Sequence, residues 1–209
     1  MEQKQKTKFV YWIDDKLYLN ITNRCSNRCR FCIKNFRKGV RGFRLELLRE
    51  PTSTQIINEL MEVLNTKNWA EAIFCGFGEP TERLDLLLEI TRWIKRYFGK
   101  PLLFRVNTNG QGYLLNPGRK VIKELKEAGI NKVSVSLNAS NEKKYVNICQ
   151  PQFENAYNAV VDFIKKAKKE LVAEVTAVAF SDIDIKEISK ITKRLGIKFR
   201  RREYISAVY

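Results

Sequence analysis

Three cysteines, Cys25, Cys29 and Cys32, lie close together in the segment NRCSNRCRFC. The chain contains no histidine, so a fourth protein ligand would have to come from Cys75 or Cys149. Structural zinc is usually held by two separated pairs of ligands, which one tight triplet does not match. A [4Fe–4S] cluster can instead be held at three corners by a single loop, and one iron then stays open for a substrate or cofactor. The spacing therefore favours an iron–sulfur cluster with an open coordination position.

The basic residues outnumber the acidic ones, 39 to 23, which gives a net charge of +16. Such an excess favours anionic partners such as nucleic acid, phosphates or acidic peptides, although basic residues spread over a solvated surface would give the same total. Eight basic residues and no acid lie between residues 24 and 44: Arg24, Arg28, Arg30, Lys34, Arg37, Lys38, Arg41 and Arg44. They are expected either to form a cationic funnel for an anionic substrate or to point into solvent.

Apolar runs and amphipathic segments alternate along the chain. Strands are predicted at 9–13, 16–22, 70–80 with its turn, 101–110, 131–139, 171–180 and 197–205, and helices at 52–65, 82–99, 118–129, 153–170 and 184–196. From the second strand onward, strands and helices alternate, which predicts a parallel α/β sheet. A doubly wound sheet and part of a β/α barrel both fit, and the length allows about three quarters of an eightfold barrel.

The segments that look chemical follow the predicted strands of this parallel series. The cysteines follow its first strand, CGFGEP the second, NTNG the third and SLNAS the fourth. The last strand carries Lys198, Arg200 and Arg202 on one face and Arg201 on the other. Ligands in both architectures bind at the carboxyl ends of the strands, so we expect these residues to meet in one site.

The motif Cys25-x3-Cys29-x-Phe31-Cys32 resembles the CxxxCxΦC signature of radical SAM enzymes, in which Φ is aromatic. GFGEP resembles the GGE-type motif of that family, and NTNG and SLN lie where the family contacts S-adenosylmethionine (SAM). The resemblance covers nearly the whole chain. It implies a partial (β/α)6 TIM-like barrel preceded by a short N-terminal β-hairpin. The segment 10–36 more narrowly resembles the TatD-associated radical SAM proteins.

The resemblance also implies how the domain is divided. Residues 1–209 are expected to form a single radical SAM domain. Residues 1–15 would be an N-terminal extension and hairpin strand, and 33–51 a basic loop after the cluster motif.

The resemblance implies a [4Fe–4S] cluster held by Cys25, Cys29 and Cys32, with SAM on the open iron. The expected SAM site contains Phe31 near the adenine, the backbone of Gly76, Gly78 and Glu79 at the methionyl amine, Asn107 and Asn109 near the ribose and methionyl group, Ser136, Asn138, and Val178 as an adenine wall. Ser136 and Asn138 are neutral where relatives often carry an acid and a lysine. A charged contact to the SAM carboxylate is therefore expected from elsewhere in the chain.

Several of these residues also have a purely structural interpretation. The NTNG segment is also typical of an ordinary turn. Ser136 alternates with valines along its strand, so this serine could simply fill the barrel interior. Cys75 and Cys149 are expected to be small buried apolar residues, with Cys149 in a connection between helices.

The resemblance implies an enzyme that cleaves SAM reductively to a 5′-deoxyadenosyl radical, which abstracts hydrogen from an unidentified, anionic substrate. That substrate would be a small molecule, a peptide or a nucleic acid, and the electron donor a flavodoxin or ferredoxin type of protein. Alternatives are a glycyl-radical-enzyme activase, an enzyme like 7-carboxy-7-deazaguanine synthase, and a non-catalytic metal-stabilised nucleic-acid-binding module.

The sequence shows neither a signal peptide nor an apolar segment of membrane-spanning length, so a cytoplasmic location without membrane contact is expected. Clustered thiols in that compartment bind metal more often than they form disulfides.

Overall fold

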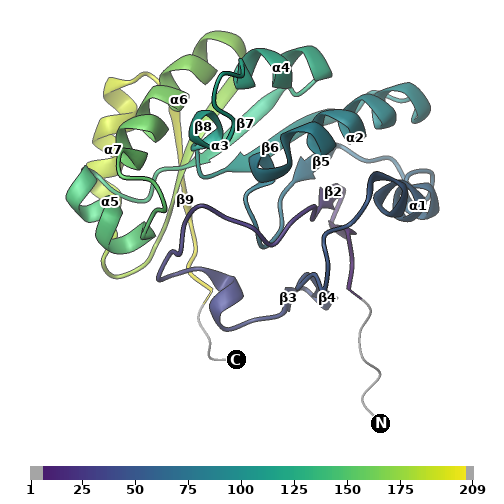
Figure 1. The fold of residues 1–209 in the computed structure, drawn as a ribbon, viewed down its shortest axis with the longest axis horizontal. Coiled ribbons are helices and arrows are strands. Elements are labelled where there is room, and N and C mark those ends of the chain that lie inside the picture. The colour runs from purple at the N-terminus through teal and green to yellow at the C-terminus, as the bar shows by residue number, and fades with distance from the viewer. Residues whose placement is uncertain (1–6, 206–209) are drawn as a thin grey trace.

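The computed structural model describes residues 7–205 and contains one curved, seven-stranded sheet (Figure 1). Its strands are β1 (Val10–Ile13), β2 (Lys16–Leu19), β5 (Glu71–Phe74), β6 (Leu103–Thr108), β7 (Lys132–Ser136), β8 (Val172–Val178) and β9 (Lys198–Arg202). They lie side by side in chain order, and only the β1–β2 hairpin is antiparallel. A doubly wound sheet would reverse its strand order, so the predicted partial (β/α)6 barrel with an N-terminal hairpin is confirmed.

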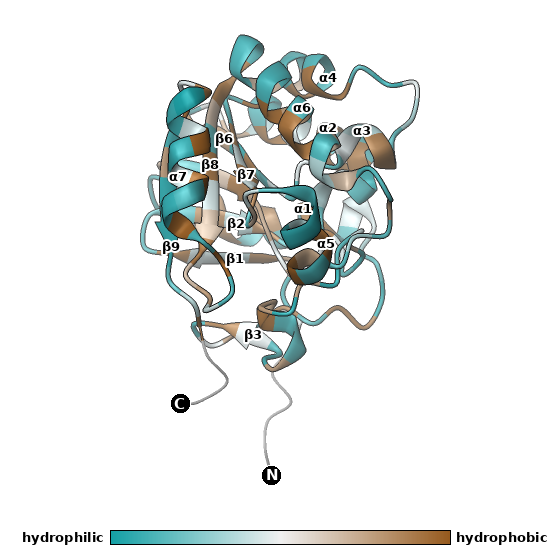
Figure 2. Ribbon diagram, turned by 90° about the vertical axis from the view of Figure 1, so that its left-hand side faces the viewer, coloured by the Kyte–Doolittle hydropathy of each residue, from teal (hydrophilic) through white to brown (hydrophobic). Residues whose placement is uncertain are grey.

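The five predicted helices are present as α1 (Ser53–Val63), α2 (Leu84–Tyr97), α4 (Val121–Ala128), α6 (Ala156–Glu170) and α7 (Ile185–Arg194). They cover the outer face of the sheet (Figure 1). The alternation of teal and brown along α6 and α7 in Figure 2 is that of amphipathic helices. Their apolar sides bury the outward-facing strand residues, such as Phe74, Val106 and Val135, in one core. No helix in the described part of the chain is long and apolar enough to cross a membrane.

The connections contain more structure than the sequence indicated. The basic loop holds a 3-10 helix, η1 (Ile33–Asn35), and a two-stranded hairpin of β3 (Gly39–Val40) and β4 (Phe43–Arg44). A second 3-10 helix, η2 (Pro80–Arg83), precedes α2, and a short α3 (Gly112–Leu115) follows β6. Cys149 lies in a helix, α5 (Glu142–Cys149), so the prediction of a connection there is wrong. Residues 1–6 of the predicted N-terminal extension lie outside the described residues.

The inner face of the sheet is polar near its middle. Glu174, whose side chain is only 3% exposed, accepts a hydrogen bond from Arg200 at 2.9 Å and one from Ser134 at 3.1 Å. Lys132 pairs with the same carboxylate at 3.4 Å. The charge of Arg200 is therefore paired with a buried carboxylate on the inner face of the sheet, and this arginine does not belong to a free cationic face.

Burial acts to raise the pKa of Glu174, but the hydrogen bond and the charge of Arg200 outweigh it, so its pKa lies below the usual 4.5. Such a carboxylate stabilises the fold above about pH 4.5 and loses that contribution as the pH falls through its folded pKa. We expect Glu174→Gln to lower the free energy of unfolding by about 1–3 kcal/mol at pH 7. The difference from wild type should shrink below about pH 4.

Urea denaturation at pH 7 and pH 3.5 measures this difference. The control is Glu187→Gln, which removes an exposed carboxylate paired with Lys190 and should cost less than about 0.5 kcal/mol. An equal loss for Glu174→Gln at both pH values would contradict the prediction.

Candidate active site

A cavity of about 260 Å³ lies at the carboxyl ends of the parallel strands. It is lined by all twelve residues that the sequence predicted to bind the cluster or SAM: Cys25, Cys29, Phe31, Cys32, Gly76, Gly78, Glu79, Asn107, Asn109, Ser136, Asn138 and Val178. They come from the cluster loop and from the ends of four neighbouring strands, so the fold assembles them from distant parts of the chain. Cys75 also lines the cavity and is only partly buried, so its prediction as a buried apolar residue is wrong.

The cluster loop, residues 25–32, rests on the last turn of α5. The backbone N–H of Arg28 donates to the carbonyl of Cys149, and that of Arg30 donates to the carbonyl of Ile148, both at 3.0 Å. These carbonyls are among those that a helix leaves unpaired at its carboxyl end. The loop therefore supplies the C-terminal partners of α5, and α5 fixes the course of the loop.

A buried set of side chains reinforces this docking. Gln111 donates to the Oδ1 of Asn27 at 2.6 Å, and both amides donate to the hydroxyl of Tyr145, each at 3.0 Å. Cys149 is fully buried and hydrogen-bonds the sulfur of Cys29; this bond and burial raise the pKa of Cys29. The sequence interpretation missed Tyr145 and Gln111, although an asparagine cap at 141 followed by apolar residues at helical spacing was a readable signal.

Cys25, Cys29 and Cys32 all line this cavity, and cysteine thiolates are the usual ligands of iron–sulfur clusters. Within residues 7–205, no three His, Cys, Asp or Glu side chains converge closely enough to hold one metal ion. Burial, followed by the charge of Glu79, raises the pKa of Cys25 to about 12, so any metal that binds this sulfur would have to displace its proton. The buried Oδ1 of Asn107 lines the cavity and has no hydrogen-bond partner, as expected where a ligand with donor groups binds. These residues fit a cluster together with a polar ligand.

The carboxylate of Glu79 is fully buried and ties two strand ends together. Its Oε1 accepts from the hydroxyls of Thr81 at 2.7 Å and Thr108 at 2.8 Å, and its Oε2 accepts from the backbone N–H of Asn109 at 2.6 Å. Burial raises its pKa, and these hydrogen bonds act against the rise. The side chain is thus occupied inside the protein, so only the backbone of this segment is free to contact a ligand.

We expect Glu79→Gln to destabilise the chain although it removes a buried charge. In either orientation the NH₂ group of the new amide would face a backbone N–H, that of Asn109 on one side or that of Thr81 on the other, and leave that N–H unpaired. The expected loss is about 1–3 kcal/mol in the free energy of unfolding. Denaturation of the metal-free protein would measure it, with Glu82→Gln on the adjacent, partly exposed 3-10 turn as the control. A Glu79 variant as stable as wild type would contradict the bracing role.

The other predicted polar contacts divide into two groups. Asn109 donates to the Oγ of Ser26 at 2.9 Å and lies 3.8 Å from the sulfur of Cys25, while Asn138 accepts from the backbone N–H of Val178 at 3.0 Å. Both side chains therefore hold the protein together. Asn107 and Ser136 also line the cavity and are the ones left available for a ligand.

The basic segment 24–44 does not supply the charges of the cavity. None of its eight cationic side chains lines the cavity. Arg30 pairs with Asp182 at 2.7 Å, and Arg44 pairs with Glu46 at the same distance. Among the residues that line the cavity, Arg202 at the end of β9 is the one cation. The predicted cationic funnel is therefore reduced to one arginine at the cavity itself.

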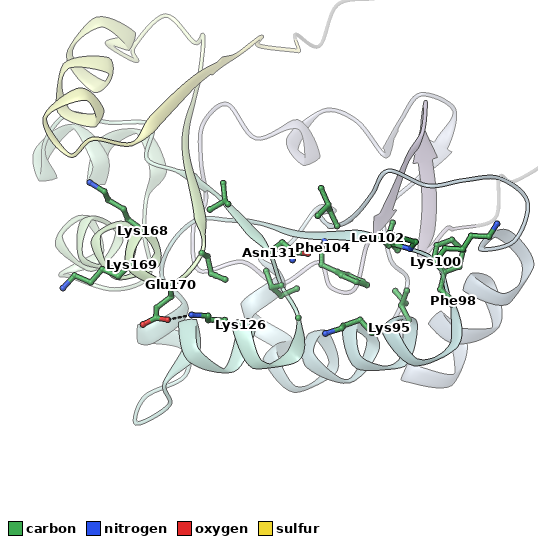
Figure 3. Close-up of a pocket in the computed structure, with 17 residues that line it drawn as sticks. Lys95, Phe98, Lys100, Leu102, Phe104, Lys126, Asn131, Lys168, Lys169 and Glu170 are labelled. Atoms are coloured by element: carbon green, nitrogen blue, oxygen red, sulfur yellow. Dashed lines mark hydrogen bonds and ion pairs between the residues drawn. The ribbon is translucent and has the colours of Figure 1, made fainter.

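A larger groove of about 940 Å³ lies at the opposite, amino end of the strands (Figure 3). Its lysines include Lys95, Lys126, Lys168 and Lys169, which belong to the last turns of α2, α4 and α6. Cations at helix carboxyl ends offset the helix dipoles, and Lys126 also pairs with Glu170 at 2.7 Å. These contacts account for part of the positive charge without a ligand.

Comparison with known proteins supports the same family. The model of the radical SAM superfamily matches residues 19–195. GTP 3′,8-cyclase of Aquifex aeolicus is 27% identical over 194 residues, which cover 90% of this chain and 56% of the relative. A probable GTP 3′,8-cyclase of Methanococcus vannielii is 28% identical over 187 residues, covering 90% and 58%. The chain thus spans a little over half the length of these relatives.

The fold comparison agrees. The crystal structure of a radical SAM methyltransferase from Sphaerobacter thermophilus superposes with a TM-score of 0.66 at 12% identity, covering 95% of this chain and 69% of the other. The narrower resemblance to TatD-associated proteins and the single-domain boundaries stay predictions. The family match extends from the last residue of β2 to the end of α7 and includes the cysteine triplet. The chain belongs to the radical SAM superfamily, whose enzymes use a [4Fe–4S] cluster and SAM.

Proposed function

We propose that Cys25, Cys29 and Cys32 hold the [4Fe–4S] cluster and that the cavity beside them binds SAM. The observation that carries this proposal is the convergence of all twelve predicted residues on one cavity at the carboxyl ends of the strands. When bound, the cluster and SAM supply hydrogen-atom abstraction from a substrate, with methionine and 5′-deoxyadenosine as products.

The protein's part is to orient these groups and to restrict water. The α5 turn and the Asn27–Gln111–Tyr145 set fix the cluster loop. Glu79 fixes the backbone of Asn109, and Asn109 in turn reaches Ser26 and Cys25. The open Oδ1 of Asn107 would accept from the ligand, and Phe31 and Val178 would provide apolar walls.

The substrate we favour is a nucleotide-like anion. The two curated relatives described above are named for GTP, and the chain itself carries a charge of +16. Because the chain spans only part of those relatives, their reaction is not transferred whole. A glycyl-radical activase, an enzyme like 7-carboxy-7-deazaguanine synthase and a flavodoxin or ferredoxin type of donor remain compatible proposals.

Anaerobic reconstitution tests the proposal. A brown protein with about four irons per chain that releases 5′-deoxyadenosine from SAM under dithionite is expected. Addition of GTP or other nucleotides should increase that release if the substrate is of this class. A colourless protein that binds only zinc, or one that binds SAM without cleaving it, would overturn the proposal and favour a metal-stabilised binding module.

A further inference from the structure

Three charged residues line the cavity, and two of them are already neutralised or enclosed. Glu79 is buried and hydrogen-bonded to Thr81, Thr108 and Asn109. Glu203 pairs with Arg201 at 3.2 Å. The guanidinium group of Arg202 has no hydrogen bond or ion pair to any residue between 7 and 205. An arginine with five free donors beside a cavity is suited to bind an oxyanion through two parallel hydrogen bonds.

The position of Arg202 places its charge at the mouth of the cavity. It ends β9 opposite Val178, and its carbonyl accepts from the backbone N–H of Ala179 at 2.8 Å, which fixes the backbone. Arg202 lines the cavity together with Tyr11 of the hairpin and Cys32 of the cluster loop, so the same cavity brings this arginine, the hairpin and the cluster loop together.

Aromatic rings surround the end of the same strand. The ring of Tyr204 lies 5.1 Å from that of Phe180 and 6.2 Å from that of Phe36, and Phe180 lies 6.1 Å from Phe31. Figure 1 shows the end of β9 close to the loop that carries η1, where Phe36 follows. Of these rings, Phe31 and Tyr204 line the cavity, and Phe36 and Phe180 pack behind Tyr204. Because Phe31 is assigned to SAM, a substrate held at Arg202 would meet the ring of Tyr204 next to its anionic group. This combination suits a phosphorylated or carboxylated compound that also carries a planar ring.

Charge balance favours the substrate over SAM as the partner of this arginine. SAM has an ammonium, a carboxylate and a sulfonium, so it is a cation of net charge one, whereas a cluster held by three thiolates is anionic. The charges of these two groups would largely offset each other and leave that of Arg202 without a counter-charge. An anionic substrate would supply that counter-charge.

On these grounds, and resting on the proposed function, we propose that Arg202 is the residue that binds an oxyanion of the substrate, a phosphate or a carboxylate, at the mouth of the SAM cavity.

The test is calorimetric titration of the anaerobically reconstituted full chain with SAM present. GTP and inorganic pyrophosphate probe the phosphate source of the oxyanion, and glutarate probes the carboxylate source. At least one probe should bind wild type saturably, and Arg202→Gln should weaken that binding about tenfold or more. Arg202→Lys, which keeps the charge but not the fork of donors, should recover part of it.

The matched control is Lys198→Gln, which removes one charge from the amino end of the same strand, away from the cavity. It should change the dissociation constant less than twofold. Absence of saturable binding of all three probes to wild type would overturn the inference, and so would equal weakening by Arg202→Gln and Lys198→Gln.

Reductive release of 5′-deoxyadenosine from SAM, measured on the same wild-type preparation, distinguishes failure of the inference on Arg202 from failure of the proposed function. If it occurs while probe binding is independent of Arg202, the inference on Arg202 is wrong and the proposed function stands. If it does not occur, the proposed function fails, even where an anion binds at Arg202.

Discussion

Cys32→Ala will yield a folded chain that no longer retains a [4Fe–4S] cluster. Cys32 lies on the loop side of the cavity, is only partly buried, and donates its backbone N–H to the carbonyl of Cys29 at 3.0 Å, a bond that alanine keeps. Loss of its sulfur leaves two thiols of the triplet, too few to hold the cube by its three corners. We expect iron to fall from about four per chain to well below one after reconstitution, with little change in stability of the metal-free protein.

Cys75→Ala is the matched control, because Cys75 lines the same cavity but lies outside the triplet. It should retain wild-type iron and visible absorption. Iron analysis and absorbance after desalting would decide. If Cys75→Ala loses the cluster while Cys32→Ala keeps it, the assignment of the three ligands is wrong.

Gly78→Ala adds a single methyl group and is expected to destabilise the chain strongly. A Cβ on Gly78 would lie 2.4 Å from the carbonyl oxygen of Thr22 and 2.5 Å from that of Arg24, the lead-in to the cluster loop. The carbonyl of Arg24 already accepts from the backbone N–H of Glu79 at 2.8 Å, so it has little freedom to withdraw. We expect a loss of at least about 3 kcal/mol in the free energy of unfolding, together with weaker cluster retention.

Gly118→Ala separates this clash from the general cost of a side chain on a glycine. Gly118 has a φ of +78° and nothing within 4 Å of its added Cβ, so only the conformational cost applies, about 1 kcal/mol. Chemical denaturation and iron retention of the two variants should be compared. Equal losses of stability in the two variants would show that the close approach of Gly78 to the backbone of Thr22 and Arg24 is not the reason for the glycine.

The sheet and the composition of the site could be predicted because they depend on local patterns. Period-two and helical spacing locate the strands and the main helices, and a parallel series brings the strand ends to one edge. Gly78 stood out as part of a motif, but its neighbours Thr22 and Arg24 are more than fifty residues away, so the reason for the glycine could not be read from the sequence.

Contacts between distant segments account for what the sequence did not reveal. The eight basic residues from Arg24 to Arg44 formed a clear pattern, yet one partner, Asp182, lies 152 residues from Arg30 and could not be read from the sequence. Strand periodicity places Arg200 and Arg202 on the same face of β9, but Glu174 on the neighbouring strand β8 pairs only with Arg200. Periodicity gives the face on which a side chain lies. It does not show which charged residue of a neighbouring strand or distant loop lies beside that side chain.

The seating of the cluster loop on the last turn of α5 joins residues near the start of the chain to residues some 120 positions later. During synthesis, the three cysteines emerge from the ribosome long before the surface that shapes their loop exists. Productive iron insertion should therefore wait until most of the barrel has been made, and an apoprotein with a nearly finished scaffold is the form that a cluster-delivery system would meet.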